Sequence, residues 1–176
     1  MKRWILVLLV MQGGILPTGV LGKEVFKMEK LTVTSAVFAE GAAIASKYTC
    51  DGGDVSPPLA IGAMPADTRS LALIMDDPDA PGGIWVHWVI WNIPAQTREI
   101  PENGLPAGAS QRRNDWKRNG YGGPCPPSGT HRYFFKLYAL DTTLTLAPSA
   151  TKADLEHAMK GHVLAAGQLM GTYKRR

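Results

Sequence analysis

The sequence is poor in cysteine and lacks several motifs that would mark a catalytic or metal centre. Two cysteines occur among 176 residues, and no Cys-x-x-Cys pair is present, which argues against a structural zinc site. No serine or cysteine lies in a nucleophile elbow, so an evident catalytic nucleophile is missing. No internal repeat, low-complexity tract or interdomain linker is visible. The missing nucleophile favours a binding site over a catalytic one.

Charge is not concentrated enough to indicate a polyanionic partner. Nineteen basic and fifteen acidic residues give a net charge of +4. The basic residues are scattered apart from small groups within residues 112–118 and 174–176, a pattern too weak to predict nucleic-acid binding. No basic amphipathic helix is readable, which ranks a membrane-surface role last.

Long apolar runs are absent beyond the first residues. Two basic residues precede an apolar run from Trp4 to Met11, which is too short to cross a bilayer. A basic start, a short apolar centre and small residues at a cleavage point are typical of a secretory signal. An uncleaved anchor and a buried first strand are the alternatives. We expect a signal over residues 1–22 and a single mature domain over 23–176, periplasmic or secreted and without stable membrane insertion; without a signal the protein would be cytoplasmic.

Thirteen prolines and nineteen glycines cluster between apolar runs. Turn-forming residues between short apolar segments predict a mainly β fold, with two antiparallel sheets in a β-sandwich and one or two C-terminal helices. Strands are expected over residues 31–38, 71–75, 84–93 and 133–140, with mostly irregular chain over 94–130.

The segment 84–93 is the strongest predicted strand. Side chains alternate along a strand, so His87 should share a face with Val89, and Val86 should share the other face with Trp88. Both faces are apolar, which predicts a central strand covered on each side.

Helical signals occur only near the C-terminus. Thr151 can cap a helix, Asp154 suits its first turn, and apolar residues follow at helical spacing. After an interruption at Gly161, a second helical piece is predicted over residues 162–169.

The loop 76–81 reads Asp-Asp-Pro-Asp-Ala-Pro. Its prolines fix φ at two positions, so the loop should be stiff and should hold Asp77 and Asp79 in constant directions. The alternative is that both carboxylates only accept hydrogen bonds from turn amides.

His87 lies on an otherwise apolar strand, where an imidazole needs a partner. We expect Asp77 or Asp79 to reach it, raise the pKa of the ring and leave a proton for an anion. A core histidine with a purely structural partner is the competing interpretation.

His131 and Tyr133 should point to one side of the last predicted strand, because they are two residues apart. The preceding Gly122 and Gly123 could let backbone N–H groups approach a ligand and form an anion-binding nest. Ordinary packing of the two rings is the alternative.

Cys50 and Cys125 lie in turn-rich segments and could pair in an exported protein, or remain two free thiols. Two Asp and two His could also hold a divalent metal, although their spacing matches no standard motif. The alternative function is a hydrolase with Ser128 or Cys125 as a nucleophile beside a histidine. A disulfide between the two cysteines would exclude Cys125 as the nucleophile.

Several motifs cover essentially the whole predicted mature chain. In order, they are the segments 48–52 with 56–58, 76–81, 85–88, 121–127, 129–133, 161–165 and 171–173. Together they resemble the phosphatidylethanolamine-binding protein family, also called Raf kinase inhibitor-like, in its bacterial branch.

The resemblance implies a sandwich of two antiparallel sheets and a small pocket for phosphate-like anions or phospholipid headgroups, without a cofactor or metal. It also implies regulation of a kinase or a serine protease as a partner protein. Asp79 would support the pocket loop. The residues that match the family pocket are Asp77, His87, Gly123, Pro124, His131 and Tyr133.

The sequence departs from the family pattern in two places. Gln168 stands where bacterial relatives often carry an acidic residue, and the signal-like start is absent from many cytoplasmic members. The compartment is therefore predicted from the N-terminal residues and not from the family.

Overall fold

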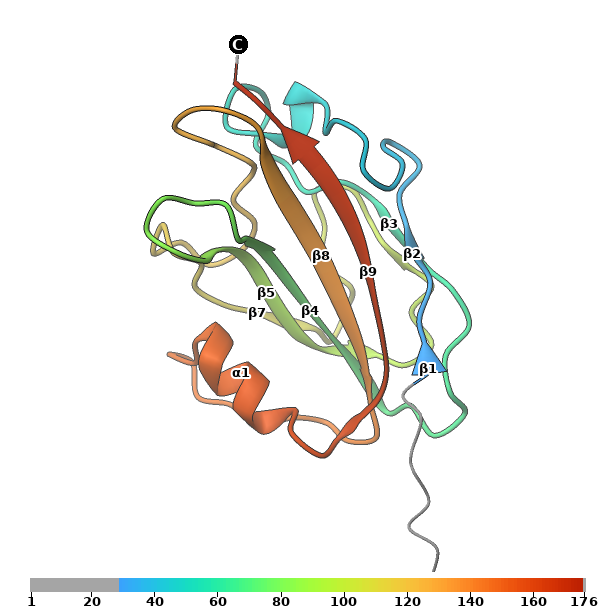
Figure 1. Ribbon diagram of the computed structural model, residues 1–176. Helices are drawn as coiled ribbons and strands as arrows, with labels where there is room; N and C mark the ends of the chain where they lie inside the picture. Colours follow the sequence, from blue (N-terminus) through green and yellow to red (C-terminus); the bar gives the residue numbers. More distant parts are fainter. Residues whose placement is uncertain (1–28, 176) are drawn as a thin grey trace, which may run out of the picture.

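The computed structural model describes residues 29–175 and contains two β-sheets and one α-helix (Figure 1). The predicted mainly β sandwich is confirmed. The larger sheet has six strands in the order β1-β9-β8-β4-β5-β7, and the smaller has three in the order β2-β3-β6. Neighbouring strands are antiparallel except for β1 and β9. The larger sheet contains β1 (Glu29–Lys30), β4 (Ser70–Asp77), β5 (Trp85–Pro94), β7 (Ser110–Gln111), β8 (His131–Leu140) and β9 (Val163–Tyr173); the smaller contains β2 (Val33–Thr34), β3 (Leu59–Ile61) and β6 (Glu99–Ile100).

Strand β4 is buried along its whole length in the middle of the larger sheet. Its alternate side chains enter two separate cores, as a strand covered on both faces requires. Leu73 and Met75 pack between the sheets, in the core that also holds Phe135. Ile74 faces the opposite way and packs in a core with Leu155 of the helix α1 (Lys152–Ala158).

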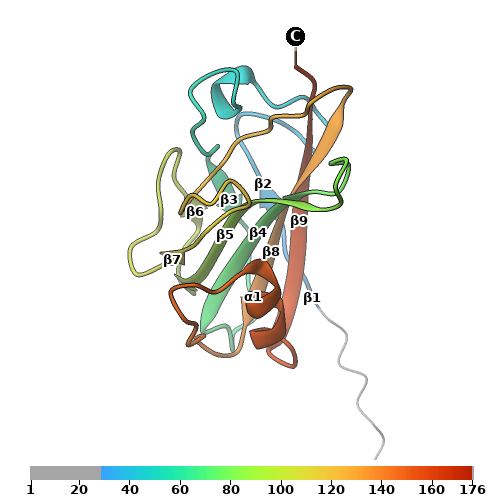
Figure 2. The ribbon, with the colours of Figure 1, turned by 90° about the vertical axis from the view of Figure 1, so that its left-hand side faces the viewer.

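The helix α1 covers the face of the larger sheet that is opposite the smaller sheet, as Figures 1 and 2 show together. Thr151 accepts a hydrogen bond from the backbone of Asp154, and the Asp154 carboxylate accepts one in return from the backbone of Thr151. This capping box confirms the predicted start of the helix. The prediction that β5 is covered on both faces is confirmed, but β5 is not central: it lies next to the edge of the larger sheet, where the short strand β7 pairs with only two of its residues.

The predicted second helical piece over 162–169 is wrong, because β9 occupies this region. β9 pairs with β8 from Val163, opposite Leu140, to Tyr173, opposite His131. Its small residues suit close packing: a Cβ on Gly171 would come within 2.6 Å of Ile44. Long-range pairing has overridden the local helical signal.

The predicted first strand over 31–38 is also shorter than expected. Only Val33–Thr34 pairs within the smaller sheet, opposite Ala60 and Ile61 of β3. A 3₁₀ turn over Ser46–Tyr48 precedes the disulfide loop described below. The predicted signal peptide lies outside the described residues.

Candidate functional site

Three strand ends bring the predicted polar side chains together. Asp77 ends β4, His87 is near the start of β5, and His131 and Tyr133 begin β8. β4 lies between β5 and β8 and is antiparallel to both, so its last residues lie beside the first residues of its two neighbours. Residues separated by up to 54 positions in the chain thereby face one cavity.

A β-bulge in β5 sets the direction of His87. Met75 pairs with Trp88 and Asp76 pairs with Val86, so His87 is the extra residue on its strand. Val86 consequently packs on the helix side, and the His87 ring meets the Tyr133 ring edge-on at 5.1 Å between centroids. The predicted face-sharing of His87 with Val89 and of Val86 with Trp88 is wrong in both cases, because the bulge interrupts the alternation: Val86 and Val89 pack on the helix side, and Trp88 packs between the sheets.

Asp77 connects β8 to the loop that follows β4. Its Oδ2 accepts a hydrogen bond from Nδ1 of His131 at 2.7 Å, and its Oδ1 accepts one from the backbone N–H of Asp79 at 2.8 Å. Both Asp77 and His131 are buried. The carboxylate therefore fixes the orientation of the His131 ring and leaves its Nε2 without a partner among the described residues.

Asp79 ties the same loop to β8 through Arg132. Its carboxylate accepts from Nη2 of Arg132 at 2.6 Å and from both Nε and the backbone N–H at 2.9 Å. These charge-assisted hydrogen bonds lower the pKa of Asp79 to about 2. The loop is thus held in place on both sides of Pro78.

His87 has a different partner from the one predicted. Its Nδ1 lies 2.6 Å from the carbonyl oxygen of Gly122, and neither Asp77 nor Asp79 binds it. Burial lowers the pKa of the ring and outweighs the opposing effects of the Gly122 hydrogen bond and nearby carboxylates. The expectation of a raised pKa is therefore wrong, and the ring is neutral near neutral pH.

The expected anion nest at the glycines is not formed. The backbone N–H of Gly122 donates to the His87 carbonyl at 3.0 Å, and that of Gly123 donates to Asp54 Oδ1 at 2.6 Å. Pro124 offers its carbonyl to the Cys50 N–H at 3.1 Å. A Cβ on Gly123 would lie 2.6 Å from the Tyr48 carbonyl oxygen, so this glycine allows two backbone segments to approach. Gly123 and Pro124 therefore support the site from outside the cavity lining.

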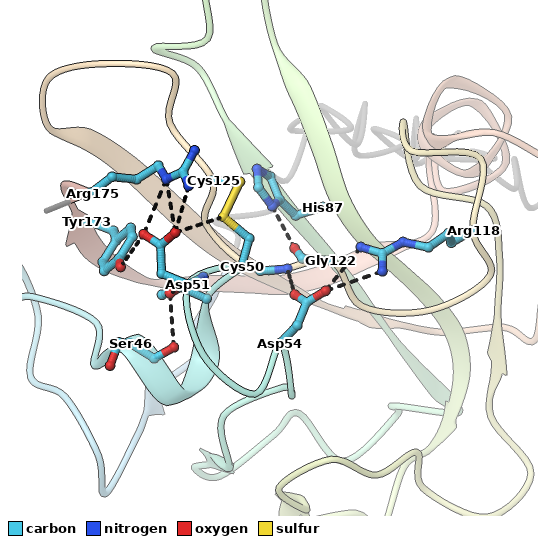
Figure 3. Close-up of a disulfide and its surroundings, with 12 residues drawn as sticks. Ser46, Cys50, Asp51, Asp54, His87, Arg118, Gly122, Cys125, Tyr173 and Arg175 are labelled. Atoms are coloured by element: carbon cyan, nitrogen blue, oxygen red, sulfur yellow. Dashed lines mark hydrogen bonds and ion pairs between the residues drawn. A yellow bond between two sulfur atoms is a disulfide. The ribbon is translucent and has the colours of Figure 1, made fainter.

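Cys50 and Cys125 form a disulfide, with 5.4 Å between their Cα atoms, which resolves the alternative left open by the sequence. Figure 3 shows how the bond joins the Cys50 loop to the segment beside His87. Asp51, in the same loop, accepts hydrogen bonds from Tyr173 and Arg175. Cys125 lines the cavity, so the crosslink lies directly in its wall.

The cavity has a volume of about 310 Å³ and contains one carboxylate, two imidazoles and two indoles. No lysine or arginine lines it among the described residues. Tyr133, which the sequence predicted as a ligand-binding residue, lies behind His87 and is not among the lining residues; its side chain is fully buried, and burial raises the pKa of its hydroxyl. The lining residues are Asp77, Ala80, Pro81, Gly82, Gly83, Ile84, Trp85, His87, Trp116, Cys125, Pro127 and His131.

Trp116 was missed by sequence reasoning, although it is the only aromatic residue between positions 111 and 120. Two hydrogen bonds hold its neighbour Asp115 on β5, because the Val86 N–H donates to the Asp115 carboxylate and the Asp115 N–H donates to the Val86 carbonyl. The Trp116 ring then meets the His87 ring edge-on at 4.8 Å and the Trp85 ring at 5.3 Å. A single tryptophan in a polar loop was the sequence feature that could have indicated its role in the site.

Gln168 lies away from this cavity. It lines a separate depression of about 830 Å³ with Lys30, Glu40 and Tyr138. On β9 it pairs with Lys136 of β8. Its position therefore gives it no contact with the His87–His131 site.

Comparison with known proteins identifies the family. A sequence model of the phosphatidylethanolamine-binding protein family matches residues 34–174. A protein of Methanothermobacter thermautotrophicus named UPF0098 protein is 51% identical over 150 residues, which cover 82% of this chain and 99% of the relative. A Pyrococcus horikoshii protein of the same name is 49% identical over 159 residues, covering 84% of this chain and 79% of that relative.

Two solved structures share the fold. One is a phosphatidylethanolamine-binding protein homologue of Chlamydia trachomatis, CT736, with a TM-score of 0.80 and 38% identity. The other is Escherichia coli YbcL, described as a member of the mammalian phosphatidylethanolamine-binding protein family, with a TM-score of 0.78 and 32% identity. Each match covers 84% of this chain and 99% of the other. The chain belongs to the phosphatidylethanolamine-binding protein family, as its motifs predicted.

Two further observations concern the described residues alone. Within residues 29–175, no three His, Cys, Asp or Glu side chains gather closely enough to hold a metal ion together. The same part of the chain contains no helix that is long and apolar enough to span a membrane.

Proposed function

We propose that this protein is a non-catalytic binding protein whose cavity takes a phosphate-type group, either free or as a phospholipid headgroup. The observation that carries the proposal is the pair of buried histidines, His87 and His131, whose Nδ1 atoms are both engaged and whose rings line one cavity. Membership of the phosphatidylethanolamine-binding protein family supports the same class of ligand.

The size and polarity of the cavity suit a small headgroup. About 310 Å³ is at the lower end of the range for small-molecule sites. The imidazoles of His87 and His131, which both line the cavity, can exchange hydrogen bonds with a compact polar group. Trp85 and Trp116 supply an apolar wall for any organic part of the ligand.

The state of the polar groups favours binding over catalysis. Cys125, the one sulfur in the cavity wall, is tied up in the disulfide and cannot act as a thiolate nucleophile. Asp77 is occupied by two hydrogen bonds that orient its neighbours. Regulation of a kinase or protease remains a proposal based on the family resemblance.

We also propose that the protein is exported. The signal-like first 22 residues and the Cys50–Cys125 disulfide support this, because disulfides persist mainly in oxidising compartments. Cell fractionation checks it: accumulation in the cytoplasm with an intact N-terminus would contradict export.

Histidine-resolved NMR tests the binding proposal, with inorganic phosphate and O-phosphoethanolamine as probes. Saturable shifts are expected at the rings of His87 and His131. His157 and His162 are internal controls, because they lie outside the cavity lining. Shifts at all four histidines would indicate nonspecific salt effects. Unchanged resonances at His87 and His131 would contradict the proposed function.

A further inference from the structure

A single peptide group connects an acidic side chain with a cavity histidine. Its carbonyl, which belongs to Gly122, lies 2.6 Å from Nδ1 of His87. Its N–H, which belongs to Gly123, donates to Oδ1 of Asp54 at 2.6 Å. The C=O and N–H of a trans peptide point in opposite directions, so Asp54 and His87 bind opposite sides of the same planar group. Figure 3 shows this peptide between the Asp54 carboxylate and the His87 ring.

The peptide group determines which hydrogen bonds His87 can make. A carbonyl oxygen only accepts, so Nδ1 of His87 carries a proton and the neutral ring presents a lone pair on Nε2. Nε2 has no partner among the described residues, and the ring lines the cavity. The oxygens of an ionised phosphate are acceptors as well. His87 can therefore bind such a group only when Nε2 has taken up a proton.

Several charged and titratable groups face His87 from the elements around it. Burial keeps the ring neutral near neutral pH in the free protein, and the nearby carboxylates oppose this effect by raising the pKa of the ring. From β8, the Tyr133 ring meets His87 edge-on, and burial raises the pKa of its hydroxyl. The other groups are Asp76 and Asp77 on β4, Asp115 in the loop before Trp116, and His131 across the cavity.

Asp54 is held firmly in position for its contact with the peptide. Its φ of 51° lies in the left-handed region, which Asp and Asn adopt more readily than most residues. Its second oxygen, Oδ2, accepts hydrogen bonds from both terminal nitrogens of Arg118 at 3.2 Å. A carboxylate bound to a peptide N–H polarises the group and makes its carbonyl a stronger acceptor. The carbonyl that receives this effect is the one bound to His87.

We propose that an ionised phosphate group in the cavity places a proton on Nε2 of His87, and that Asp54 is the positioning residue that stabilises the resulting imidazolium through the Gly122–Gly123 peptide. The inference rests on the proposed function and states how the site supplies a donor to its ligand. The proton is taken from solvent, and the protonated Nε2 donates to an ionised oxygen. Free phosphate and the phosphodiester of a lipid headgroup both provide such an oxygen.

The two cavity histidines then have equivalent support. Asp77 binds Nδ1 of His131 directly at 2.7 Å, whereas Asp54 acts on Nδ1 of His87 through one peptide group. In each case a carboxylate stabilises positive charge on the ring from the side away from the ligand. The cavity thereby binds an anion without a lysine or arginine in its lining among the described residues.

NMR of ¹⁵N-labelled histidines tests the protonation step, because the shift of a ring nitrogen reports whether it carries a proton. The probes are inorganic phosphate and glycerophosphoethanolamine, the soluble phosphodiester of a lipid headgroup. At neutral pH, Nε2 of His87 should be unprotonated in the free protein and protonated at saturation with either probe. Tighter binding of glycerophosphoethanolamine would support a lipid headgroup as the ligand, and equal binding would support recognition of the phosphate alone; both agree with the inference.

Asp54→Asn tests the positioning role. Asn keeps an oxygen for the Gly123 N–H and tolerates the same backbone conformation, but it lacks the charge. We expect both probes to bind about fivefold more weakly, because a charge-assisted hydrogen bond becomes a neutral one. The Nδ1–H resonance of His87 should also move upfield. Simple long-range attraction predicts the opposite change in affinity, since loss of a negative charge near the cavity would favour an anion.

Asp51→Asn is the matched control. It removes a carboxylate from the same disulfide loop, but the partners of Asp51 are Tyr173 and Arg175 and not the cavity peptide. Affinity for both probes should stay within about twofold of the unaltered protein, because solvent screens this exposed charge. If Asp54→Asn does not fold, Arg118→Gln replaces it. Asp54 then acts on the peptide without its competing cation, so the Nδ1–H resonance of His87 should move downfield.

The possible outcomes distinguish this inference from the proposed function. An unprotonated Nε2 of His87 in the saturated complex would overturn the inference and leave the binding function intact. Unchanged affinity and unchanged His87 resonances in Asp54→Asn, or an upfield move in Arg118→Gln, would overturn the role of Asp54. Failure of both probes to bind the unaltered protein would overturn the proposed function together with the inference.

Discussion

Asp76 and Asp77 are adjacent, both are buried, and they face opposite sides of the same strand end. Asp76 turns toward the helix, where Nζ of Lys136 lies 2.7 Å and Nζ of Lys152 lies 2.8 Å from its oxygens. Asp77 turns toward the cavity, where its partners are His131 and the Asp79 backbone. Two fixed cations neutralise the first carboxylate, whereas the second meets an imidazole beside an open space.

The comparison teaches that the surroundings decide the role of a buried carboxylate. The helix side is an ion-pair cluster that links β4, β8 and α1, and both of its cations are engaged by the one carboxylate. On the cavity side, hydrogen bonds fix the orientations of the polar groups and leave ring nitrogens available. The first arrangement holds elements together, and the second prepares a binding site.

The largest expected effect comes from removing the two carboxylates separately. Asp76→Ala should cost about 3–5 kcal/mol of unfolding free energy, because it leaves two partly buried lysines without their shared partner. Asp77→Ala should cost less, about 1–3 kcal/mol, but should abolish phosphate binding because His131 loses its orientation. Urea unfolding measures the first quantity and the NMR titration the second. Greater destabilisation by Asp77→Ala, with binding retained, would reverse the assignment of roles.

An intermediate effect is expected from opening the disulfide. Replacing both cysteines by serine should lower the unfolding free energy by about 2–4 kcal/mol, because the bond closes a loop between residues 75 positions apart. The local stability should fall more around the cavity than around the helix α1, since Cys125 lines the cavity. Native-state hydrogen exchange tests this: faster exchange should appear around residues 122–127 and not in α1. Uniform acceleration would show that the crosslink acts on the whole domain.

The smallest effect concerns the ion pair at the cavity loop. The pKa of Asp79 is about 2 in the folded protein, below its ordinary value, so Arg132 stabilises the fold when Asp79 is ionised. This contribution is complete above about pH 4 and disappears as the pH falls toward 2. Asp79→Asn should therefore lose about 1 kcal/mol at neutral pH, because the pair is partly solvated.

Measuring unfolding free energy against pH checks this prediction, with Asp67→Asn as a matched control for an exposed carboxylate in another part of the fold. The curves for the unaltered protein and Asp79→Asn should converge at acid pH. A constant difference down to pH 2 would show that packing, and not ionisation, carries the effect.

Strong local patterns were enough to predict much of the fold. The dense β-branched and aromatic runs became β5 and β8, and the Thr151–Asp154 cap began α1, because strand and cap signals arise within a few residues. The polar residues of the site were also identifiable, since an Asp-Pro-Asp loop and two histidines on apolar strands are conspicuous.

The sequence by itself determined which residue types supply the cavity and that they sit at strand ends. Only the tertiary structure decided how they are connected: a one-residue bulge directs His87 toward Tyr133, the Gly122 carbonyl accepts a hydrogen bond from His87, and the Asp77 carboxylate accepts one from His131. It likewise decided that 163–173 is a strand, because its pairing with β8 outweighs local propensity. Register and hydrogen-bond partners depend on contacts between distant segments, which no local pattern encodes.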